Sequence, residues 1–227
     1  MTEPSVHDMF RKVSIFADVD DATLERLANL ATPIDYPKST LVFEQNAPGD
    51  AMFIIFSGKV RVVLFGENGK DITLTFFKPG DFFGEMSLLD EQPRSANVIT
   101  VEPSTLLVLK REDFLEHLKE SPTTAINVIT ELSRRLRKAD AVIGNLALLD
   151  VYGRVARLLM ELAEKDGQEV DYGILIRKRP TQQDIASMVN SSRETVSRVL
   201  NEFQKRGLLL MDGKKVVLKP SFYSNDL

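Results

Sequence analysis

The sequence predicts an α+β protein with a β-rich front, one long central helix and a mostly helical back. Residues 34–109 contain short strand-like runs between turns rich in Gly, Pro and Asp, which is typical of a roll, sandwich or barrel. Residues 122–149 carry apolar residues at alternating steps of three and four, the pattern of a long amphipathic helix. Residues 150–227 show short helices followed by a hairpin. We therefore expect domains at residues 1–121 and 150–227, joined by the helix 122–149.

Composition excludes several classes of protein. The 227-residue chain has no cysteine, so a disulfide framework, a zinc-thiolate site and a cysteine nucleophile are excluded. Its two histidines, His7 and His117, lie far apart, so we expect no metal site and interpret each as a surface or cap residue. No set of nucleophile, base and orienting group can be assembled, and we expect no enzyme. No apolar run reaches membrane-spanning length and no leader pattern is present, which favours a cytoplasmic protein without membrane contact.

The net charge of −4 is unevenly distributed along the chain. Residues 1–110 carry a net charge of −6, whereas residues 151–227 carry +3. An acidic front and a basic back indicate that any nucleic-acid contact is made by the last third.

The front third begins with one or two short helices over residues 6–31, and strands follow. Turn signals separate the strands at Pro48-Gly49-Asp50, Ser57-Gly58, Glu67-Asn68-Gly69 and Pro79-Gly80-Asp81. Such a roll or barrel can hold one small ligand. The expected strands are residues 40–43, 52–56, 60–65, 72–77, 97–101 and 105–109.

Residues 83–96, which we call the cassette, interrupt this strand pattern. Gly84 permits close backbone approach to a ligand, and the turn after it leaves N–H groups free for an anion. Arg94 offers a fork of donors suited to phosphate, with the Ser95 hydroxyl beside it. Glu85 can accept from a sugar hydroxyl or hold Arg94 in position. The alternative is a surface turn with a Glu–Arg ion pair.

The central helix starts at a clear boundary, because Ser121 can cap it and Pro122 suits its first position. Its narrow apolar seam fits a partner helix, which predicts a homodimer; the alternative is a helix packed on its own domain. The predicted interface residues are Ile129, Leu132, Leu136, Ala139, Ile143 and Leu146.

The back third predicts a helix-turn-helix. An amphipathic helix at 151–164 and a loop at 165–173 precede a short strand at 174–176. Thr181 can cap a helix, and Asn190 suits a left-handed turn. Ser191-Ser192-Arg193-Glu194 has the S-x-x-E pattern of a capping box for the next helix, which runs from Ser191 to Phe203. Two short helices joined by a tight turn are typical of DNA-binding proteins.

The start of that second helix carries residues that match the base code of DNA. Arg pairs with guanine and Glu with the cytosine amino group, although capping alone could also explain Glu194. A hairpin at 208–218, turning at Asp212-Gly213, brings Lys214, Lys215 and Lys219 for phosphate contact and completes a winged helix. The predicted DNA-binding residues are Lys178, Thr181, Gln182, Ser191, Arg193, Glu194, Ser197 and Arg198.

Three motifs carry a family resemblance over nearly the whole chain. The cassette has the F-G-E-x-x-L and P-R-S-A pattern of a phosphate-binding cassette, residues 192–198 read S-R-E-T-V-x-R, and residues 144–151 read G-N-L-A-x-L-D-V. The chain thus resembles the cyclic-AMP receptor protein / fumarate–nitrate regulator superfamily of bacterial transcription regulators, closer to the first branch. Lack of cysteine argues against the iron–sulfur branch, and two remote histidines argue against haem sensing.

The resemblance implies a cyclic-nucleotide-binding β-roll of jelly-roll type, a long dimerisation helix and a C-terminal winged helix-turn-helix. It implies that Glu85 holds the ribose 2′-OH and Arg94 the cyclic phosphate. The remaining ligand contacts that it implies are Gly84, Met86, Ser95, Ala96, Arg135, Ala139 and Asp140.

The effector that the family resemblance implies is cyclic AMP first and cyclic GMP second, with no other cofactor. The cyclic-AMP receptor branch has a Thr-Ser pair that hydrogen-bonds the adenine amino group. At the corresponding positions this chain has Ala139 and Asp140, which lack hydroxyls. Asp140 is either a purine-facing acceptor or a solvated helix residue. The alternative is a regulator that acts without a cyclic mononucleotide or senses another effector such as cyclic di-GMP.

The partners that the family resemblance implies are a near-palindromic operator resembling TGTGA–spacer–TCACA and a second copy of the chain. RNA polymerase is a further candidate partner, through residues 165–173. The regulated genes, and activation as opposed to repression, are not readable from the sequence.

Overall fold

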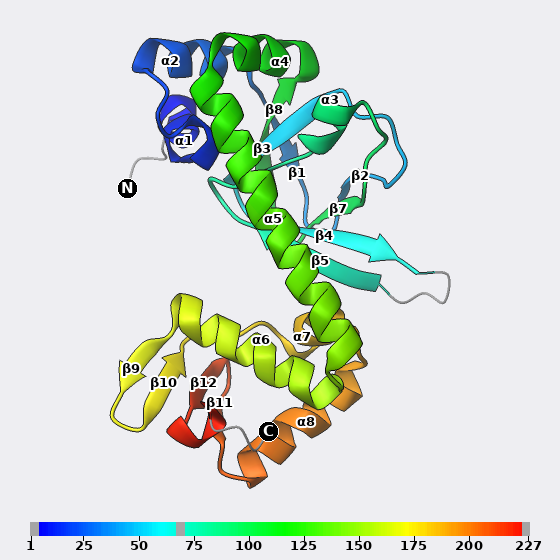
Figure 1. The fold of residues 1–227 in the computed structure, drawn as a ribbon, viewed down its shortest axis with the longest axis vertical. Coiled ribbons are helices and arrows are strands. Elements are labelled where there is room, and N and C mark those ends of the chain that lie inside the picture. The colour runs from blue at the N-terminus through cyan, green and yellow to red at the C-terminus, as the bar shows by residue number, and fades with distance from the viewer. Residues whose placement is uncertain (1–4, 67–70, 224–227) are drawn as a thin grey trace. The chain divides into compact units, whose positions relative to one another are not determined.

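The computed structural model describes residues 5–66 and 71–223, in two compact units that divide between Arg137 and Lys138 (Figure 1). The predicted turn Glu67-Asn68-Gly69 lies outside the described residues. The long helix α5 (Pro122–Leu148) runs through the division, so the three-part division at residues 121 and 150 stays a prediction. Within the described ranges, no helix combines the length and apolarity that a membrane crossing requires.

The first unit begins with the helices α1 (Val6–Lys12) and α2 (Asp21–Leu30), joined through the short 3-10 turn η1 (Ser14–Phe16). The side chains of Ser5 and Asp20 cap the two α-helices. Helix α4 (Arg111–Glu120), which the sequence pattern did not predict, packs with them at one end of the unit (Figure 1). These helices bury one apolar cluster that includes Phe10, Phe16, Leu24, Leu27, Met52, Ile54 and Phe114.

Two four-stranded antiparallel sheets form the β-roll. One sheet has the order β1-β8-β3-β6 and the other β2-β7-β4-β5. All six predicted strands are confirmed to within one residue at each end, whereas β1, β6 and the helix α3 were not predicted. The strand bounds are β1 Thr32–Tyr36, β2 Leu41–Phe43, β3 Ala51–Ser57, β4 Val60–Phe65, β5 Asp71–Phe77, β6 Phe82–Phe83, β7 Asn97–Thr100 and β8 Ser104–Lys110.

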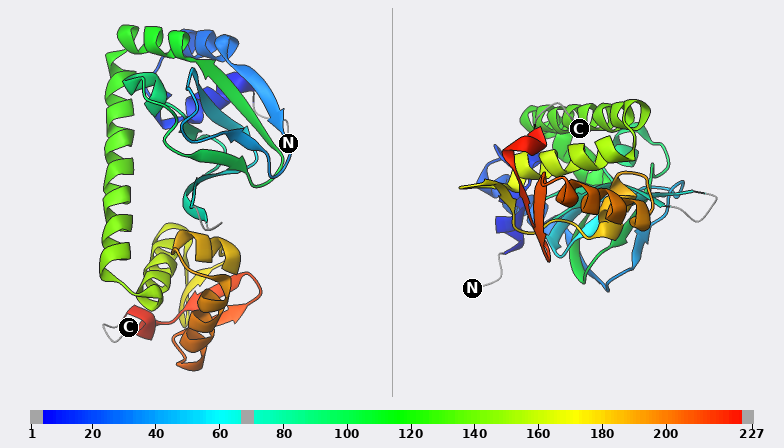
Figure 2. Two further views of the ribbon diagram at one scale, coloured as in Figure 1. Left: turned by 90° about the vertical axis from the view of Figure 1, so that its right-hand side faces the viewer. Right: turned by 90° about the horizontal axis from the view of Figure 1, so that it is seen from below.

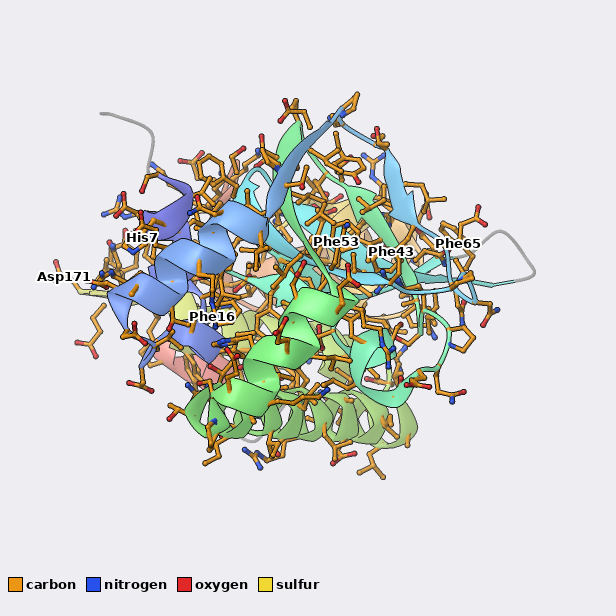
Figure 3. All side chains as sticks on the ribbon, turned by 90° about the horizontal axis from the view of Figure 1, so that it is seen from above. His7, Phe16, Phe43, Phe53, Phe65 and Asp171 are labelled. Carbon is orange, nitrogen blue, oxygen red and sulfur yellow. The ribbon has the colours of Figure 1, made fainter. Side chains whose placement is uncertain are left out.

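An aromatic cluster fills the inside of the roll. The Phe53 ring stacks on Phe83 with 5.2 Å between centroids, and Phe43 lies 5.6 Å from Phe53. Figure 3 shows Phe43 and Phe53 among the strands, in contrast to Phe16 beside the helices. Together with Ile55, Val60, Val98 and Leu106, these rings form an apolar cluster separate from the one under the helices.

His117 is buried, with 2% of its surface exposed, so its interpretation as a surface residue was wrong. Its Nε2 lies 2.9 Å from the Thr124 hydroxyl, which in turn lies 3.0 Å from the Ser121 hydroxyl. The Phe16 ring packs beside the imidazole. His117 therefore joins the end of α4 to the first turn of α5.

Helix α5, drawn from the side in the left view of Figure 2, has a buried face and an exposed face. Ser121 accepts from the Thr124 N–H at 3.3 Å, as predicted for its cap. Thr124 and Val128 are buried, and Leu132 packs partly against the apolar cluster of the first unit. The helix is thus anchored by one face, and most of its apolar seam lies on the other.

The second unit contains α6 (Val151–Asp166), α7 (Gln182–Met188) and α8 (Arg193–Lys205), followed by the short 3-10 turn Pro220–Tyr223. A four-stranded antiparallel sheet of order β11-β12-β10-β9 completes it. The predicted loop 165–173 was wrong in part, because it contains β9, which pairs with β10 in a hairpin. The strands are β9 Gln168–Val170, β10 Gly173–Ile176, β11 Leu209–Asp212 and β12 Lys215–Leu218.

The pH dependence of stability tests the burial of His117. Burial lowers the pKa of His117 below its ordinary value of 6.5, and the nearby Arg26 lowers it further. Below pH 6.5 the unfolded chain therefore binds a proton that the folded chain resists, so this histidine lowers the free energy of unfolding as pH falls through 6.5. We expect H117Q to lose less stability than wild type between pH 7.5 and 5.5 in urea unfolding. H7Q is the matched control, and equal losses in wild type and H117Q would contradict the assignment.

Candidate functional site

The cassette turns sharply between β6 and the helix α3 (Met86–Asp90). Gly84 has φ = +84°, and a Cβ placed on it would lie 2.8 Å from Arg94 Nη1. A side chain at Gly84 is therefore opposed both by backbone conformation and by the guanidinium. Glycine at this position lets the turn close over Arg94.

Arg94 is buried, with 4% of its surface exposed. Its Nη1 and Nη2 each donate a 2.7 Å hydrogen bond, to the carbonyls of Gly84 and Ala51. The guanidinium also lies 4.3 Å above the centroid of the Phe43 ring. The buried Nε of Arg94 has no hydrogen-bond partner. Burial also lowers the pKa of the Arg94 guanidinium below its ordinary value. The structure therefore holds a cation in the roll whose Nε–H has no acceptor.

Glu85 is buried beside the same turn, with 1% of its surface exposed. Its Oε1 accepts a 2.8 Å hydrogen bond from Arg135 of α5, whereas its buried Oε2 has no partner. Burial raises the pKa of Glu85, and the positive charge of Arg135 offsets part of that rise. The alternative of a surface turn was wrong, because neither side chain lies on the surface, and the hydrogen bond to Glu85 comes from Arg135.

Arg135 ties the central helix to the roll. It donates to the Phe82 carbonyl at 2.8 Å and, at 3.3 Å, to Glu131 one turn earlier in α5. Its guanidinium also lies over the rings of Phe77 and Phe82. These contacts position Arg135 beside Glu85. A direct contact between Arg135 and a phosphate stays a prediction.

The other predicted ligand contacts differ in exposure. Ser95 and Met86 are exposed and adjacent, with 4.0 Å between Oγ and Sδ, whereas Ala96 is buried. Ala139 and Asp140 are exposed residues of α5 beyond Arg137. Their contact with a base stays a prediction.

Sequence reasoning missed the neighbours that hold Arg94. Asn46 donates from its backbone to the Arg94 carbonyl at 2.8 Å, and the Arg94 N–H donates to the Ala47 carbonyl at 2.9 Å. A Cβ on Gly49 would lie 2.9 Å from the guanidinium. The Pro48-Gly49-Asp50 turn was visible in the sequence, but nothing there showed that it packs against residue 94.

The second unit contains the predicted helix-turn-helix. Thr181 accepts from the Asp184 N–H and Asp184 accepts from the Thr181 N–H, so the cap predicted for α7 is confirmed. Asn190 has φ = +50°, which is the left-handed turn predicted between the helices. Val196, Leu200 and Phe203 bury one face of α8.

The capping box predicted from Ser191 to Glu194 was wrong. Ser192 is the N-cap of α8, and its Oγ accepts from the Thr195 N–H at 3.1 Å. The left-handed turn at Asn190 places the helix start one residue later, because Ser191 still donates from its backbone to the Ala186 carbonyl. Glu194 therefore has no capping-box role, and hydrogen bonds from its own N–H and from Ser192 lower its pKa.

The predicted DNA-contacting residues lie mostly at the surface. Lys178, Thr181, Arg193, Glu194 and Arg198 are exposed, whereas Gln182, Ser191 and Ser197 are half-buried. The first two turns of α8 thus present two cations and one carboxylate, a set that can read base edges.

The wing forms beside this helix. Asp212 pairs with Lys215, so the two turn residues are Gly213 and Lys214 rather than Asp212 and Gly213. A hollow of about 290 Å³ near the wing has basic and polar walls. Its lining residues are Arg179, Pro180, Thr181, Gln182, Gln183, Arg193 and Lys214. A positively charged hollow of this kind suits a DNA phosphate.

The described residues hold no cluster of His, Asp and Glu side chains fit to bind a metal ion.

Comparisons with known proteins match both units. Residues 33–121 match the family model of the cyclic nucleotide-binding domain, and residues 153–220 match that of the Crp-like helix-turn-helix domain. The chain is 31% identical over 214 residues to the CRP-like cAMP-activated global transcriptional regulator of Mycobacterium tuberculosis, covering 94% of this chain and 96% of that protein. The chain belongs to the CRP/FNR superfamily.

Further relatives agree with this assignment. The cyclic AMP receptor protein of Thermus thermophilus is 38% identical over 174 residues, covering 77% of each chain. The solved structure of the c-di-GMP responsive global regulator CLP of Xanthomonas campestris has a TM-score of 0.74 at 28% identity, covering 88% of this chain and 99% of that one. As a CRP/FNR-superfamily protein, this chain is a DNA-binding transcription regulator with a cyclic nucleotide-binding domain, and these relatives are regulators rather than enzymes.

Removal of each serine hydroxyl tests which residue caps α8. We expect S192A to lower the free energy of unfolding by about 1 kcal/mol, because the Thr195 N–H loses its acceptor. S191A is the matched control and should change it by less than about 0.5 kcal/mol. Urea unfolding measures both. A larger loss in S191A than in S192A would restore the cap predicted from sequence.

Proposed function

We propose that this CRP/FNR-superfamily protein is a homodimeric transcription regulator whose operator affinity is controlled by cyclic AMP bound in the β-roll. The observation that carries the proposal is the pair of unused polar atoms in the cassette, Arg94 Nε and Glu85 Oε2. A cyclic phosphate would supply an acceptor to the first, and a ribose hydroxyl would supply a donor to the second. Buried polar atoms without partners are costly, so a ligand that satisfies both is favoured.

The surroundings of these atoms support a cyclic nucleotide. Gly84 lets the backbone approach a phosphate closely, and Ser95 offers an exposed hydroxyl next to Arg94 in the chain. The Mycobacterium tuberculosis relative is named as cAMP-activated, and the Thermus thermophilus relative as a cyclic AMP receptor protein. Cyclic AMP is therefore the first candidate and cyclic GMP the second.

The alternative to a cyclic mononucleotide is a regulator that acts without one or that senses another effector such as cyclic di-GMP. Ala139 and Asp140 offer no hydroxyl to an adenine amino group, whereas the Asp140 carboxylate can accept from the donor edge of guanine. The Xanthomonas campestris relative is named as responsive to c-di-GMP. The experiment below therefore compares all three nucleotides.

Calorimetry and operator binding test the effector. We expect cyclic AMP to bind the ligand-free protein and to raise operator affinity, and R94A to weaken cyclic AMP binding at least about tenfold. R94K keeps the charge without the fork and should also lose affinity, which separates phosphate recognition from misfolding. R26A, which removes an arginine paired with Glu120 on the surface, is the matched control.

Two outcomes decide between the candidates. Binding of cyclic GMP or cyclic di-GMP without cyclic AMP binding, or full operator affinity in the absence of any nucleotide, would overturn the cyclic AMP assignment. Thermal unfolding of R94A and R94K shows whether either variant has lost its fold.

The exposed seam of α5 supports the homodimer. Ile129, Leu136 and Ile143 are each more than 60% exposed, and Leu146 is 38% exposed. Such a stripe of large apolar side chains on one helix favours a second copy of the helix. Leu132 differs from this set because it packs toward its own unit. In a two-fold dimer, two α8 helices about 34 Å apart would read a near-palindromic operator.

A charge placed in the seam tests the dimer. We expect L136E to shift the protein from dimer to monomer in sedimentation velocity, because two buried carboxylates would face each other. Operator affinity should fall in parallel, since a monomer reads only one half-site. T130E, on an exposed position off the seam, is the matched control. A monomeric wild type, or an L136E variant that remains dimeric, would contradict the assignment.

RNA polymerase stays a proposed partner through residues 165–173. This segment includes β9 and the turn that leads to β10, and it exposes Glu169, Asp171 and Tyr172.

A further inference from the structure

Arg179 binds the backbone of both residues that form the turn of the wing. It lies in the short link between β10, which ends at Ile176, and Thr181, the N-cap of α7. Its backbone N–H donates to the Lys214 carbonyl at 3.0 Å, and its Nη2 donates to the Gly213 carbonyl at 3.3 Å. Gly213 and Lys214 are the two turn residues between β11 and β12. One residue outside the hairpin therefore binds both carbonyls of its turn.

The same guanidinium binds the link to α7. Nη1 of Arg179 donates to the Pro180 carbonyl at 3.0 Å, one residue before the Thr181 cap. A turn carbonyl outside the hairpin ladder needs water or another part of the chain as its partner. Here a planar fork joins the turn of the wing to the start of α7, and this fork fixes the distance between them.

The burial of Arg179 makes it a support rather than a direct contact with DNA. The side chain is half-buried, and its Nε is buried with no hydrogen-bond partner among the described residues. Burial lowers the pKa of the Arg179 guanidinium below its ordinary value. Two of the three guanidinium nitrogens thus bind carbonyls, and the third is shielded from solvent. The neighbouring Lys178, by contrast, is exposed.

The hollow beside the wing depends on where this turn lies. Lys214 from the wing and Arg193 from α8 both line the hollow, together with first-turn residues of α7. Because Lys214 belongs to the turn itself, its distance from Arg193 follows from the position of the turn backbone. A displaced turn would separate the two cations, and one phosphate could no longer meet both.

We propose that Arg179 is a positioning residue that holds the turn of the wing against the start of α7, so that Lys214 meets a DNA phosphate. Arg179 acts through the wing and makes no phosphate contact of its own. The inference rests on DNA binding, which membership of the CRP/FNR superfamily shows, and on the phosphate contact predicted for Lys214. It is independent of the effector and of the homodimer.

The salt dependence of DNA binding tests whether Arg179 acts through Lys214. Each phosphate contact adds about 1 to the slope of log affinity against log salt concentration. We expect K214Q and R179Q each to reduce that slope by about 1 for each bound protomer, and R179Q/K214Q to reduce it no further. Fluorescence anisotropy with a labelled duplex that carries TGTGA–spacer–TCACA measures the slopes, under one nucleotide condition for all variants.

R177Q is the matched control for the loss of one positive charge. Arg177 is exposed in the same link and donates to the Gln168 side chain of β9, so R177Q should keep a slope close to that of wild type. If the slope of R179Q/K214Q falls by the sum of the two single losses, Arg179 binds a phosphate of its own and the proposal is refuted. An unchanged slope in R179Q or in K214Q also refutes it.

Amide hydrogen exchange in the free protein tests the support itself. We expect R179Q to raise exchange about threefold or more at residues 212–216, with the rest of the second unit unchanged. K214Q should leave this exchange unchanged, because Arg179 binds the backbone of residue 214 and not its side chain. R179K keeps the charge but lacks the planar fork, so its exchange should rise and its salt slope should fall as in R179Q.

The other outcomes of the exchange experiment contradict the support. A uniform rise across the second unit would show a general loss of stability, and unchanged exchange at residues 212–216 would show that the turn does not need Arg179. Wild-type exchange and a wild-type slope in R179K would assign the effect to charge alone. Calorimetry with cyclic AMP remains the test of the effector, so failure of either proposal leaves the other to its own measurement.

Discussion

The burial of ionisable groups inside the β-roll is the constraint on which the first unit depends. Moving a carboxylate or guanidinium out of water costs several kcal/mol, so each must be compensated by its surroundings. Arg94 is compensated by two carbonyls and an aromatic face, and Glu85 by Arg135. The compensation is incomplete, because Arg94 Nε and Glu85 Oε2 have no hydrogen-bond partner. Ionisable groups held in this state are typical of binding sites rather than of structural cores.

Arg135 and Arg154 are both half-buried, and they serve different purposes. Arg135 bonds a carboxylate, a carbonyl and two ring faces, and so fixes part of α5 against the roll. Arg154 bonds carbonyls alone and holds helix ends in the second unit. Lysine could supply the charge at either place but not the planar fork that reaches several acceptors at once. Helix α5 thus carries an arginine contact in the first unit, through Arg135, and is followed by one in the second unit, through Arg154.

Most of the candidate site was readable because its residues are adjacent in the chain. Gly84, Glu85, Arg94 and Ser95 fall within one short segment, and the chemistry of each side chain suggested an anion and a sugar. Their partners could not be read, since Ala51 and Phe43 approach Arg94 from other strands. The cap of α8 shows the same limit at short range. The S-x-x-E pattern favoured Ser191 as the cap, whereas the left-handed backbone at Asn190 makes Ser192 the cap.

The sequence by itself determined the α+β class, six strands of the roll, the long helix and the helix-turn-helix, because these depend on local periodicity and turn chemistry. It also determined the family, through motifs whose residues are contiguous. Only the tertiary structure decided that His117 is buried, that Glu85 pairs with Arg135 and that Leu132 packs inward from an otherwise exposed seam. Each of these three features depends on contacts with residues that are distant in the chain. Burial by such residues changes the free energy of a charged or apolar side chain more than its sequence neighbours do.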